Sequence, residues 1–272
     1  CLWGVSLWNL ERFPNVHEDE PWILSVGYKL AMQGVYGSDL FTGFHHIEQR
    51  YFEFLPLMSL LQGASARWFG VGVMQMRIAP VMLGVLTLAL TYAVARKLLG
   101  DERRRTNDEE RTSLARRPSS VIADSSSVGL VAMLLLLLWQ WSPTDGRWFA
   151  SGIPLIDLAR IARYDILVAP LGLAALWCFL RARETRRLRY DVVSGALAGL
   201  AGLAHMYGLF WVVALVLMRF VGSRDRPKTT DALRSSLLSA GLILLGVLGV
   251  WLPWLAFIFL FPNDYLGQNF QY

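Results

Sequence analysis

Long apolar runs constrain the fold of this chain more than any other feature. The runs 128–141 and 237–261 contain no charged side chain. A helix that crosses a bilayer needs about 20 predominantly apolar residues, whereas a helix at the surface of a soluble core is amphipathic. The whole chain is 54% hydrophobic and only 17% charged, which argues against a soluble globular protein. We therefore predict an all-α polytopic membrane protein.

The positions of the apolar runs predict where the spans lie. We expect the outer end of a first span in 1–8 and complete spans at 76–98, at 121 or 128 to 141, at 159–180 and at 235–261. Residues 192–221 are longer than the usual length of about 20, and basic segments flank them on both sides. They predict a hairpin of two short helices that turns near 205–208, or else one long tilted span. Small residues at Gly195, Gly199 and Gly202 would let helices pack closely.

The basic residues predict the orientation of the chain. Eighteen of the 26 Lys and Arg residues lie in the segments 96–117, 181–189 and 219–234, so the net charge of +5 does not indicate a nucleic-acid binder. By the positive-inside rule these segments face the cytoplasm. The sequence thus predicts a charged, solvated cytoplasmic loop at 99–120 and a first extracytoplasmic loop at 9–75.

The two cysteines and the chain ends add little chemistry. Cys178 lies inside an apolar run and Cys1 is the only other cysteine, so the sequence predicts neither a disulfide framework nor a zinc site. The chain begins without Met, and Tyr272 follows no closing signal. We expect it to be part of a longer protein, with 1–272 as a single membrane module.

Three consecutive carboxylates, Glu18, Asp19 and Glu20, begin the most unusual part of the first outer loop. Ser25, Lys29 and Gln33 then recur at every fourth position among apolar residues, which predicts a helix lying along the membrane interface from 21 to 34. A second such segment is expected from 48 to 61, interrupted by Pro56, and residues 262–272 are expected to form a polar exit from the last span.

Asp19 and Glu20 allow two interpretations. Adjacent carboxylates near a surface of low dielectric repel one another, so one of them can act as a general base. The same pair, placed just before Pro21, is also a good solvated beginning for a helix. The residues alone leave both interpretations open.

Several short motifs occur in an order that resembles a known family. They are Asp19-Glu20 followed by Tyr28, Ala31 and Gly34; Leu55-Pro56-Leu57; Arg77; Arg163-Tyr164-Asp165; the Gly/Ala-rich stretch 195–204; and Trp251-Leu252-Pro253-Trp254. In this order they resemble the N-terminal membrane module of GT-C class glycosyltransferases. The closest resemblance is to glycosyltransferase family 39, which includes protein O-mannosyltransferases and aminoarabinose transferases. The resemblance implies a GT-C-like helical bundle with amphipathic interfacial helices in the first outer loop.

The resemblance also implies a reaction. Such enzymes move a hexosyl or pentosyl group, with inversion, from a polyprenyl-phosphate donor to a protein, lipid or glycan acceptor on the outer face, which implies a prokaryotic plasma membrane and a cell-envelope role. Asp19 corresponds to the family's catalytic base and Glu20 to the acid beside it. Arg163 is then the first candidate to stabilise the phosphate leaving group, with Arg160 one helical turn away on the same face and Asp165 on another face. Snorkelling to lipid headgroups is the competing role for both arginines.

The histidines are further candidates for binding substrate. His45 and His46 precede Pro56 where related sequences have a His before paired prolines, although the intervening residues depart from that pattern. With Asp19 or Glu48 they suggest a divalent metal site only weakly, because their spacing is poor for metal ligands. The sequence therefore predicts no definite cofactor. His205 stands where many relatives have Lys; it could touch phosphate or acceptor, or could be satisfied between packed helices. The Trp residues near span ends are typical of aromatic belts.

Two other functions remain open. The same enzyme class could serve a different acceptor, as in oligosaccharyl or arabinosyl transferases. A transporter with an acidic outer vestibule is the alternative from another class. Transporters place ionisable residues at mid-span and often contain internal repeats; here the charges gather at span ends and no repeat is visible, which favours chemistry at the membrane interface.

Overall fold

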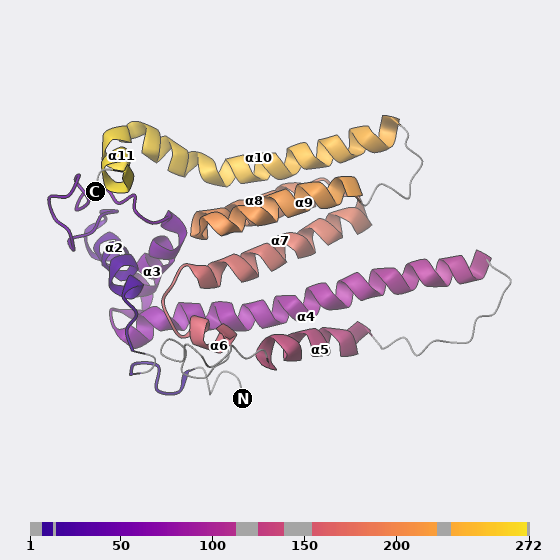
Figure 1. Cartoon of the computed structure of the whole chain (residues 1–272), viewed down its shortest axis with the longest axis horizontal. Helices are drawn as coiled ribbons and strands as arrows, with labels where there is room; N and C mark the ends of the chain where they lie inside the picture. The colour runs from indigo at the N-terminus through magenta and orange to yellow at the C-terminus, as the bar shows by residue number, and fades with distance from the viewer. Residues whose placement is uncertain (1–6, 13–14, 113–124, 139–153, 222–229, 271–272) are drawn as a thin grey trace.

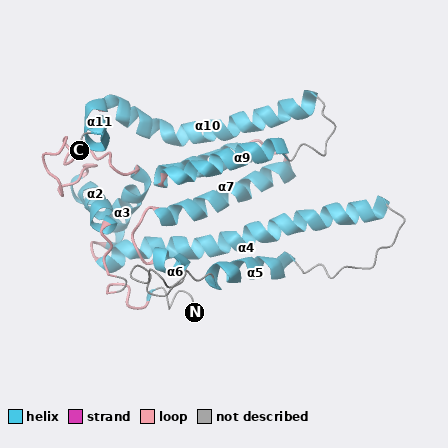
Figure 2. Ribbon diagram, in the orientation of Figure 1, coloured by secondary structure: helices cyan, strands magenta, loops and turns pink. Residues whose placement is uncertain are grey.

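A computed structural model describes residues 7–12, 15–112, 125–138, 154–221 and 230–270, and in these ranges the chain forms helices and no strands. The helices are α2 (Asp19–Gln33), α3 (Pro56–Phe69), α4 (Val73–Thr112), α5 (Ser125–Leu138), α6 (Pro154–Ala159), α7 (Asp165–Thr185), α8 (Arg189–Ala204), the 3₁₀ turn η2 (Met206–Gly208), α9 (Leu209–Val221), α10 (Thr230–Leu260) and α11 (Pro262–Phe270). The expectation of an all-α fold is confirmed for these residues (Figure 2).

Five helices, α4, α7, α8, α9 and α10, run alongside one another as an elongated bundle, with α5 beside α4 (Figure 1). Helices α2, α3 and α11 gather at one end of this bundle, which we call the loop end. The central contacts between α7, α8, α9 and α10 are made by buried apolar side chains that include Ala175, Phe179, Ala198, Leu215 and Ile243. The fold therefore places α2 and α3, from the segment expected to be the first outer loop, against one end of a bundle with membrane-type helices.

Three helical segments are long and apolar enough to cross a membrane, by length and composition: Val73–Leu98 in α4, Asp165–Thr185, which is α7, and Leu233–Leu260 in α10. Ser126–Leu137 and Met206–Val221 are shorter apolar helices. Each of the three long segments contains one proline, at Pro80, Pro170 and Pro253, which membrane helices tolerate because neighbouring groups satisfy the freed backbone. A helical, membrane-associated protein is thus supported by the described residues, whereas the end of the span expected to reach 141 lies outside them. The start of the expected first span lies outside the described residues.

The hairpin expected in 192–221 is present. Helix α8 ends at Ala204, the chain turns through His205 and η2, and α9 begins at Leu209. Glycines let α8 approach α10: a Cβ on Gly195 would lie 1.9 Å from the carbonyl oxygen of Ile243, and one on Gly246 would lie 2.1 Å from that of Val192. The predicted role of small residues in close packing is therefore confirmed for this helix pair.

Two expectations about connecting segments were wrong, and the polar exit after the last span contains a helix that was not predicted. Helix α4 continues to Thr112 through most of the segment expected as a charged loop at 99–120, because Glu and Arg are strong helix formers; the rest of that loop, 113–120, lies outside the described residues. The second amphipathic segment begins only at Pro56, a residue suited to the first helical turn. Residues 262–270 form α11.

The first interfacial segment is a helix, as expected, from Asp19 to Gln33. Asp19 and Glu20 occupy its first turn, where carboxylates interact favourably with the helix dipole. It ends at Gly34, whose φ of 71° is left-handed and whose N–H donates to the carbonyl oxygen of Leu30. Residues 139–153 lie outside the described part of the chain, and α6 begins directly after them.

Candidate functional site

Four parts of the chain meet at the loop end: the start of α2, the first turn of α4, the turn 160–164 before α7, and the tip of the α8–α9 hairpin (Figure 1). They bring together polar residues that are far apart in the sequence. Asp19 and Arg163 are separated by more than half of the chain, yet their side chains form an ion pair. We treat this cluster as the candidate site.

Glu20 and Arg77 form the buried base of the cluster. Arg77 is 0% exposed and donates from Nε to Glu20 Oε1 at 2.9 Å and from Nη2 to Glu20 Oε2 at 2.7 Å. The remaining acceptor capacity of the carboxylate is taken by the backbone N–H groups of His17, at 2.8 Å, and Ala162, also at 2.8 Å. Arg77 also donates to the backbone carbonyl of Leu10 at 3.0 Å. Glu20 is thus a structural junction between three segments.

Asp19, the neighbour of Glu20, points into a more open environment. Its side chain is 24% exposed, and its Oδ2 lies 3.2 Å from Arg163 Nε and 3.6 Å from His17 Nδ1. The Asp19 backbone N–H donates to His17 Nδ1 at 3.1 Å, so that ring nitrogen is an acceptor. Adjacent positions in the first turn of one helix therefore receive different environments: Glu20 is fully occupied and Asp19 is accessible.

Arg163 lies between two carboxylates. Its Nη2 is 3.0 Å from Asp165 Oδ2, and its Nε faces Asp19. The contact between Nε and Asp19 lacks hydrogen-bond geometry, and the buried Nε–H has no hydrogen-bond partner among the described residues. Nε thus faces Asp19 in an ion pair without a hydrogen bond, and an anionic ligand of Arg163 would compete with the two carboxylates.

Aromatic rings adjoin the charged cluster. Tyr164 stacks on the His205 ring at 4.9 Å with an interplanar angle of 11°, and the guanidinium of Arg163 lies 5.6 Å from the centre of the Tyr164 ring. The ring centroids of Tyr207 and His205 are 4.3 Å apart, and those of Phe54 and Tyr164 are 5.4 Å apart. Desolvation, helped by Asp165 and Asp19, raises the pKa of Tyr164 and outweighs Arg163, so its hydroxyl stays protonated.

Arg160 does not share a helix face with Arg163, contrary to expectation. Helix α6 ends at Ala159, and the residues before α7 form turns in which the Arg160 N–H donates to the carbonyl of Asp157. Arg160 is 5% exposed and donates from Nη2 to the Trp8 carbonyl at 2.7 Å. Desolvation lowers the pKa of Arg160, Asp157 opposes this shift and Arg77 adds to it. Arg160 thus holds the N-terminal segment against the bundle.

The prediction that Asp165 and Arg163 face apart was also wrong, because Arg163 precedes α7 in a turn and is not bound to its helical register. His205 lies in the cluster as its aromatic member, and its Nδ1 accepts from the Tyr207 N–H at 3.3 Å. His45 and His46 lie elsewhere, in the loop that α11 holds, where His46 Nδ1 is 3.0 Å from Asp264 Oδ1.

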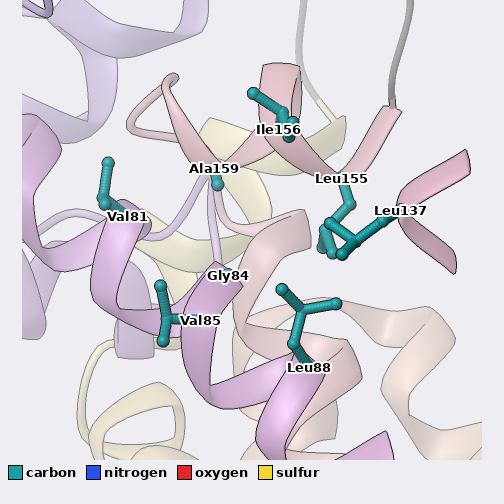
Figure 3. Close-up of a pocket in the computed structure, with 8 residues that line it drawn as sticks. All are labelled: Val81, Gly84, Val85, Leu88, Leu137, Leu155, Ile156 and Ala159. Carbon is teal, nitrogen blue, oxygen red and sulfur yellow. The ribbon is translucent and has the colours of Figure 1, made fainter. Parts of the chain in front are cut away.

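Metal ligands and a nearby pocket are the remaining features to consider around the site. Within the described residues, no group of three or more His, Cys, Asp or Glu side chains is placed to bind a metal ion. A pocket of about 270 Å³, counting its open mouth, lies between α4, α5 and α6 and is lined by apolar residues such as Val81, Leu88 and Ile156 (Figure 3). It contains no group that could take part in proton transfer, so the charged cluster remains the candidate for chemistry.

Two contributions of the cluster were not predicted from sequence. Arg77 belonged to a motif, but its pairing with Glu20 was not foreseen; an arginine near the start of an apolar run, with a carboxylate nearby in the same outer region, was the available signal. Tyr164 stood between two selected residues and was overlooked as a ring that orders both Arg163 and His205.

Comparison of the chain with protein-family models, with curated proteins and with solved structures gives no match. The function must therefore be argued from the cluster.

Proposed function

We propose that the chain is the membrane module of a multi-pass glycosyltransferase that takes a sugar from a polyprenyl-phosphate donor at the outer face. The observation that supports this proposal is the arrangement around Arg163: a partly exposed guanidinium, whose Nε makes no hydrogen bond to the described residues, lies beside the partly exposed carboxylate of Asp19 at the end of a bundle with membrane-type helices. The resemblance of the motifs to glycosyltransferase family 39 agrees with this arrangement.

The chemistry needs a base and a group that stabilises phosphate. Asp19 accepts the proton of an acceptor hydroxyl, whose oxygen attacks the anomeric carbon with inversion. The bond between that carbon and the phosphate oxygen breaks, and polyprenyl phosphate leaves with its electron pair. Arg163 stabilises the developing negative charge, for which a guanidinium in a site of low dielectric is well suited. Because Arg163 contacts Asp19 and Asp165 without substrate, phosphate must compete with these carboxylates.

The remaining residues support this pair. Glu20 holds the start of α2 against Arg77 and Ala162, so it positions Asp19 and does not itself accept the substrate proton. Tyr164 and His205 offer rings and polar edges beside Arg163, where a sugar or an acceptor can lie. The acceptor is a protein, lipid or glycan hydroxyl or amine at the membrane surface. The charges of the long apolar helices lie at their ends, which argues against the transporter alternative.

The test compares three variants in membranes that contain the full-length protein, with release of polyprenyl phosphate from a panel of lipid-linked sugars as readout. Asp19→Asn removes the base but keeps its shape, so we expect turnover to fall at least about 100-fold, the lower range for general base catalysis, with donor binding retained. Arg163→Lys is expected to weaken both donor binding and turnover, because Lys cannot bind phosphate in bidentate fashion.

Glu18→Gln is the matched control, because Glu18 is the exposed carboxylate directly before Asp19. We expect it to retain normal turnover. Turnover by Asp19→Asn equal to that of Glu18→Gln would reject Asp19 as the base and leave the cluster as a helix start with snorkelling arginines.

A further inference from the structure

Helix α3 buries polar side chains together with apolar ones such as Met58 and Ala66. Its buried side includes Ser59, Gln62 and Ser65, which are 1%, 0% and 4% exposed. The Gln62 side-chain amide donates to the Met76 carbonyl at 2.9 Å, and the Ser65 hydroxyl donates to the Gln75 carbonyl at 3.0 Å. The polar residues of α3 thus bond to backbone carbonyls near the start of α4, and the Met76 carbonyl lacks its usual partner in the helix because Pro80, four residues later, has no N–H.

The residues at the α3–α4 junction point their apolar side chains outward. Trp68 is 78% exposed, Phe69 57%, Val71 52% and Met74 37%. We call residues 68–74 the α3–α4 corner. Between Arg67 and Arg77 the sequence has no charged residue. Exposed apolar residues clustered in this way normally mark a surface that something covers.

The apolar surface of the corner continues onto a helix that is apolar enough to cross a membrane. Met74 begins the exposed apolar face of α4, and Met82 and Leu86 continue it at 47% and 46% exposure. Trp68 and Phe69 end α3 shortly before this apolar helix begins, and Arg67 precedes them, so a cation, two aromatic residues and an apolar helix follow one another as they do at a bilayer interface. This continuity distinguishes lipid from a partner protein as the material covering the corner.

We propose that the α3–α4 corner is inserted into the lipid leaflet at the loop end of the bundle. Trp68, Phe69 and Val71 lie at the boundary between headgroups and acyl chains of phospholipids, and Arg67 reaches the phosphates. Insertion of the corner depends only on the polarity and exposure of these residues, and it is independent of glycosyltransferase activity.

Insertion of the corner fixes the depth of the candidate site. Helix α2 packs directly on α3: a Cβ on Gly27 would lie 2.9 Å from the Gly63 backbone nitrogen. The start of α2 is also bonded through Glu20 to Arg77 in the first turn of α4. Asp19 and Arg163 are therefore held at headgroup depth, and the site takes a ligand whose reacting group lies in that layer.

The test labels single cysteines with the fluorophore NBD in the full chain, reconstituted into phosphatidylcholine–phosphatidylglycerol vesicles. Cys1→Ser and Cys178→Ala remove the native thiols, and Trp68→Cys, Phe69→Cys and Val71→Cys each report one position of the corner. Gln49→Cys is the matched control, since Gln49 is exposed in the loop between α2 and α3. Lipids with a doxyl quencher just below the headgroups report contact with the bilayer.

We expect NBD at the corner to emit at shorter wavelength than NBD at Gln49→Cys and to be quenched at least about twofold more by the doxyl lipids. Quenching equal to that of the control would overturn the proposal. A short emission wavelength without lipid quenching would also overturn it, because a protein surface would then cover the corner. Thermal unfolding of each labelled variant in detergent identifies any that is not folded, and the other corner positions then decide.

Discussion

At the scale of the residue, two neighbouring carboxylates have different tasks because their surroundings differ. Glu20 accepts four hydrogen bonds and is buried beside a buried arginine, whereas Asp19 is partly exposed. Removal of one partner from a buried ion pair leaves an uncompensated charge and costs about 3–5 kcal/mol. An exposed pair contributes only about 0–1 kcal/mol.

We therefore expect Glu20→Gln to lower the free energy of unfolding by roughly 3–5 kcal/mol through the buried charge of Arg77. Asp19→Asn should change it by less than about 1 kcal/mol. Denaturant unfolding of both variants in detergent, followed by tryptophan fluorescence, measures the difference. Equal stability of the two variants would show that Glu20 is not the structural member of the pair.

Some of these residue roles could be read from sequence and others could not. The acid pair, Arg163 and His205 were selected from their types and positions, and the structure brings Asp19, Arg163 and His205 into one cluster. The grouping of Arg160 with Arg163 failed because a break between α6 and α7 interrupts the helix assumed for both. That break depends on a tertiary contact, the hydrogen bond from Ala162 N–H to Glu20, which no local pattern encodes.

At the scale of the element, the contact of α8 with α10 depends on glycine. A Cβ on Gly195 would lie 1.9 Å from a backbone carbonyl of α10, whereas a Cβ on Gly241 would meet nothing within 4 Å. Gly195→Val should force the helices apart, because overpacking lowers the free energy of unfolding by about 1–3 kcal/mol. The midpoint of thermal unfolding should fall as a result. Gly241→Ala is the matched control and should keep or raise it, because Ala favours helix by about 1 kcal/mol. A normal midpoint for Gly195→Val would contradict the observed packing.

Helix α11 is bonded to the segment between α2 and α3 through side chains that include Asp264 and Gln268, and we call this set of contacts the clamp. Gln268, which is 0% exposed, accepts from the Phe52 N–H and donates to the carbonyls of His45 and Arg50. The residues that follow this clamp include Phe54, which packs against Tyr164 in the candidate site. The clamp was not predicted, because the polar residues 262–272 alone gave no reason to expect a docked helix.

The clamp should respond to acid. Partial burial acts to raise the pKa of Asp264, but hydrogen bonds from His46 and Arg50 outweigh it and hold that pKa below its ordinary value of 3.8. A lowered native pKa contributes stability that is present above 3.8 and is lost as pH falls through the native pKa. The difference in unfolding midpoint between the wild type and Asp264→Asn should therefore be constant near neutral pH and shrink below about pH 4. A difference that does not change between pH 7 and pH 3 would rule out a charged Asp264 in the clamp.

At the scale of the whole molecule, the two ends of the bundle differ in charge and in structure. The loop end contains the acid cluster, and the opposite end contains the basic ends of α4 and α7 (Figure 1), where Lys97 pairs with Glu184. Apolar runs and basic segments encode this polarity in the sequence, and for that reason the all-helical fold and the hairpin could be predicted. The lengths of the helices were less predictable: the charge of 99–112 indicates a segment in water, which was interpreted as a loop although its Glu and Arg residues are strong helix formers.

This polarity predicts the orientation of the chain in the membrane. Basic residues near span ends are retained in the cytoplasm, so the loop end with Asp19 should face outward. Gln49→Cys in the first outer loop and Arg187→Cys between α7 and α8, both exposed, place one thiol at each end in a background without Cys1 and Cys178. We expect an impermeant maleimide to label Gln49→Cys in intact cells and Arg187→Cys only after lysis. The reverse pattern would place Asp19 in the cytoplasm and reject transfer at the outer face, while the pairing of Glu20 with Arg77 and the lipid contact of the α3–α4 corner would still stand.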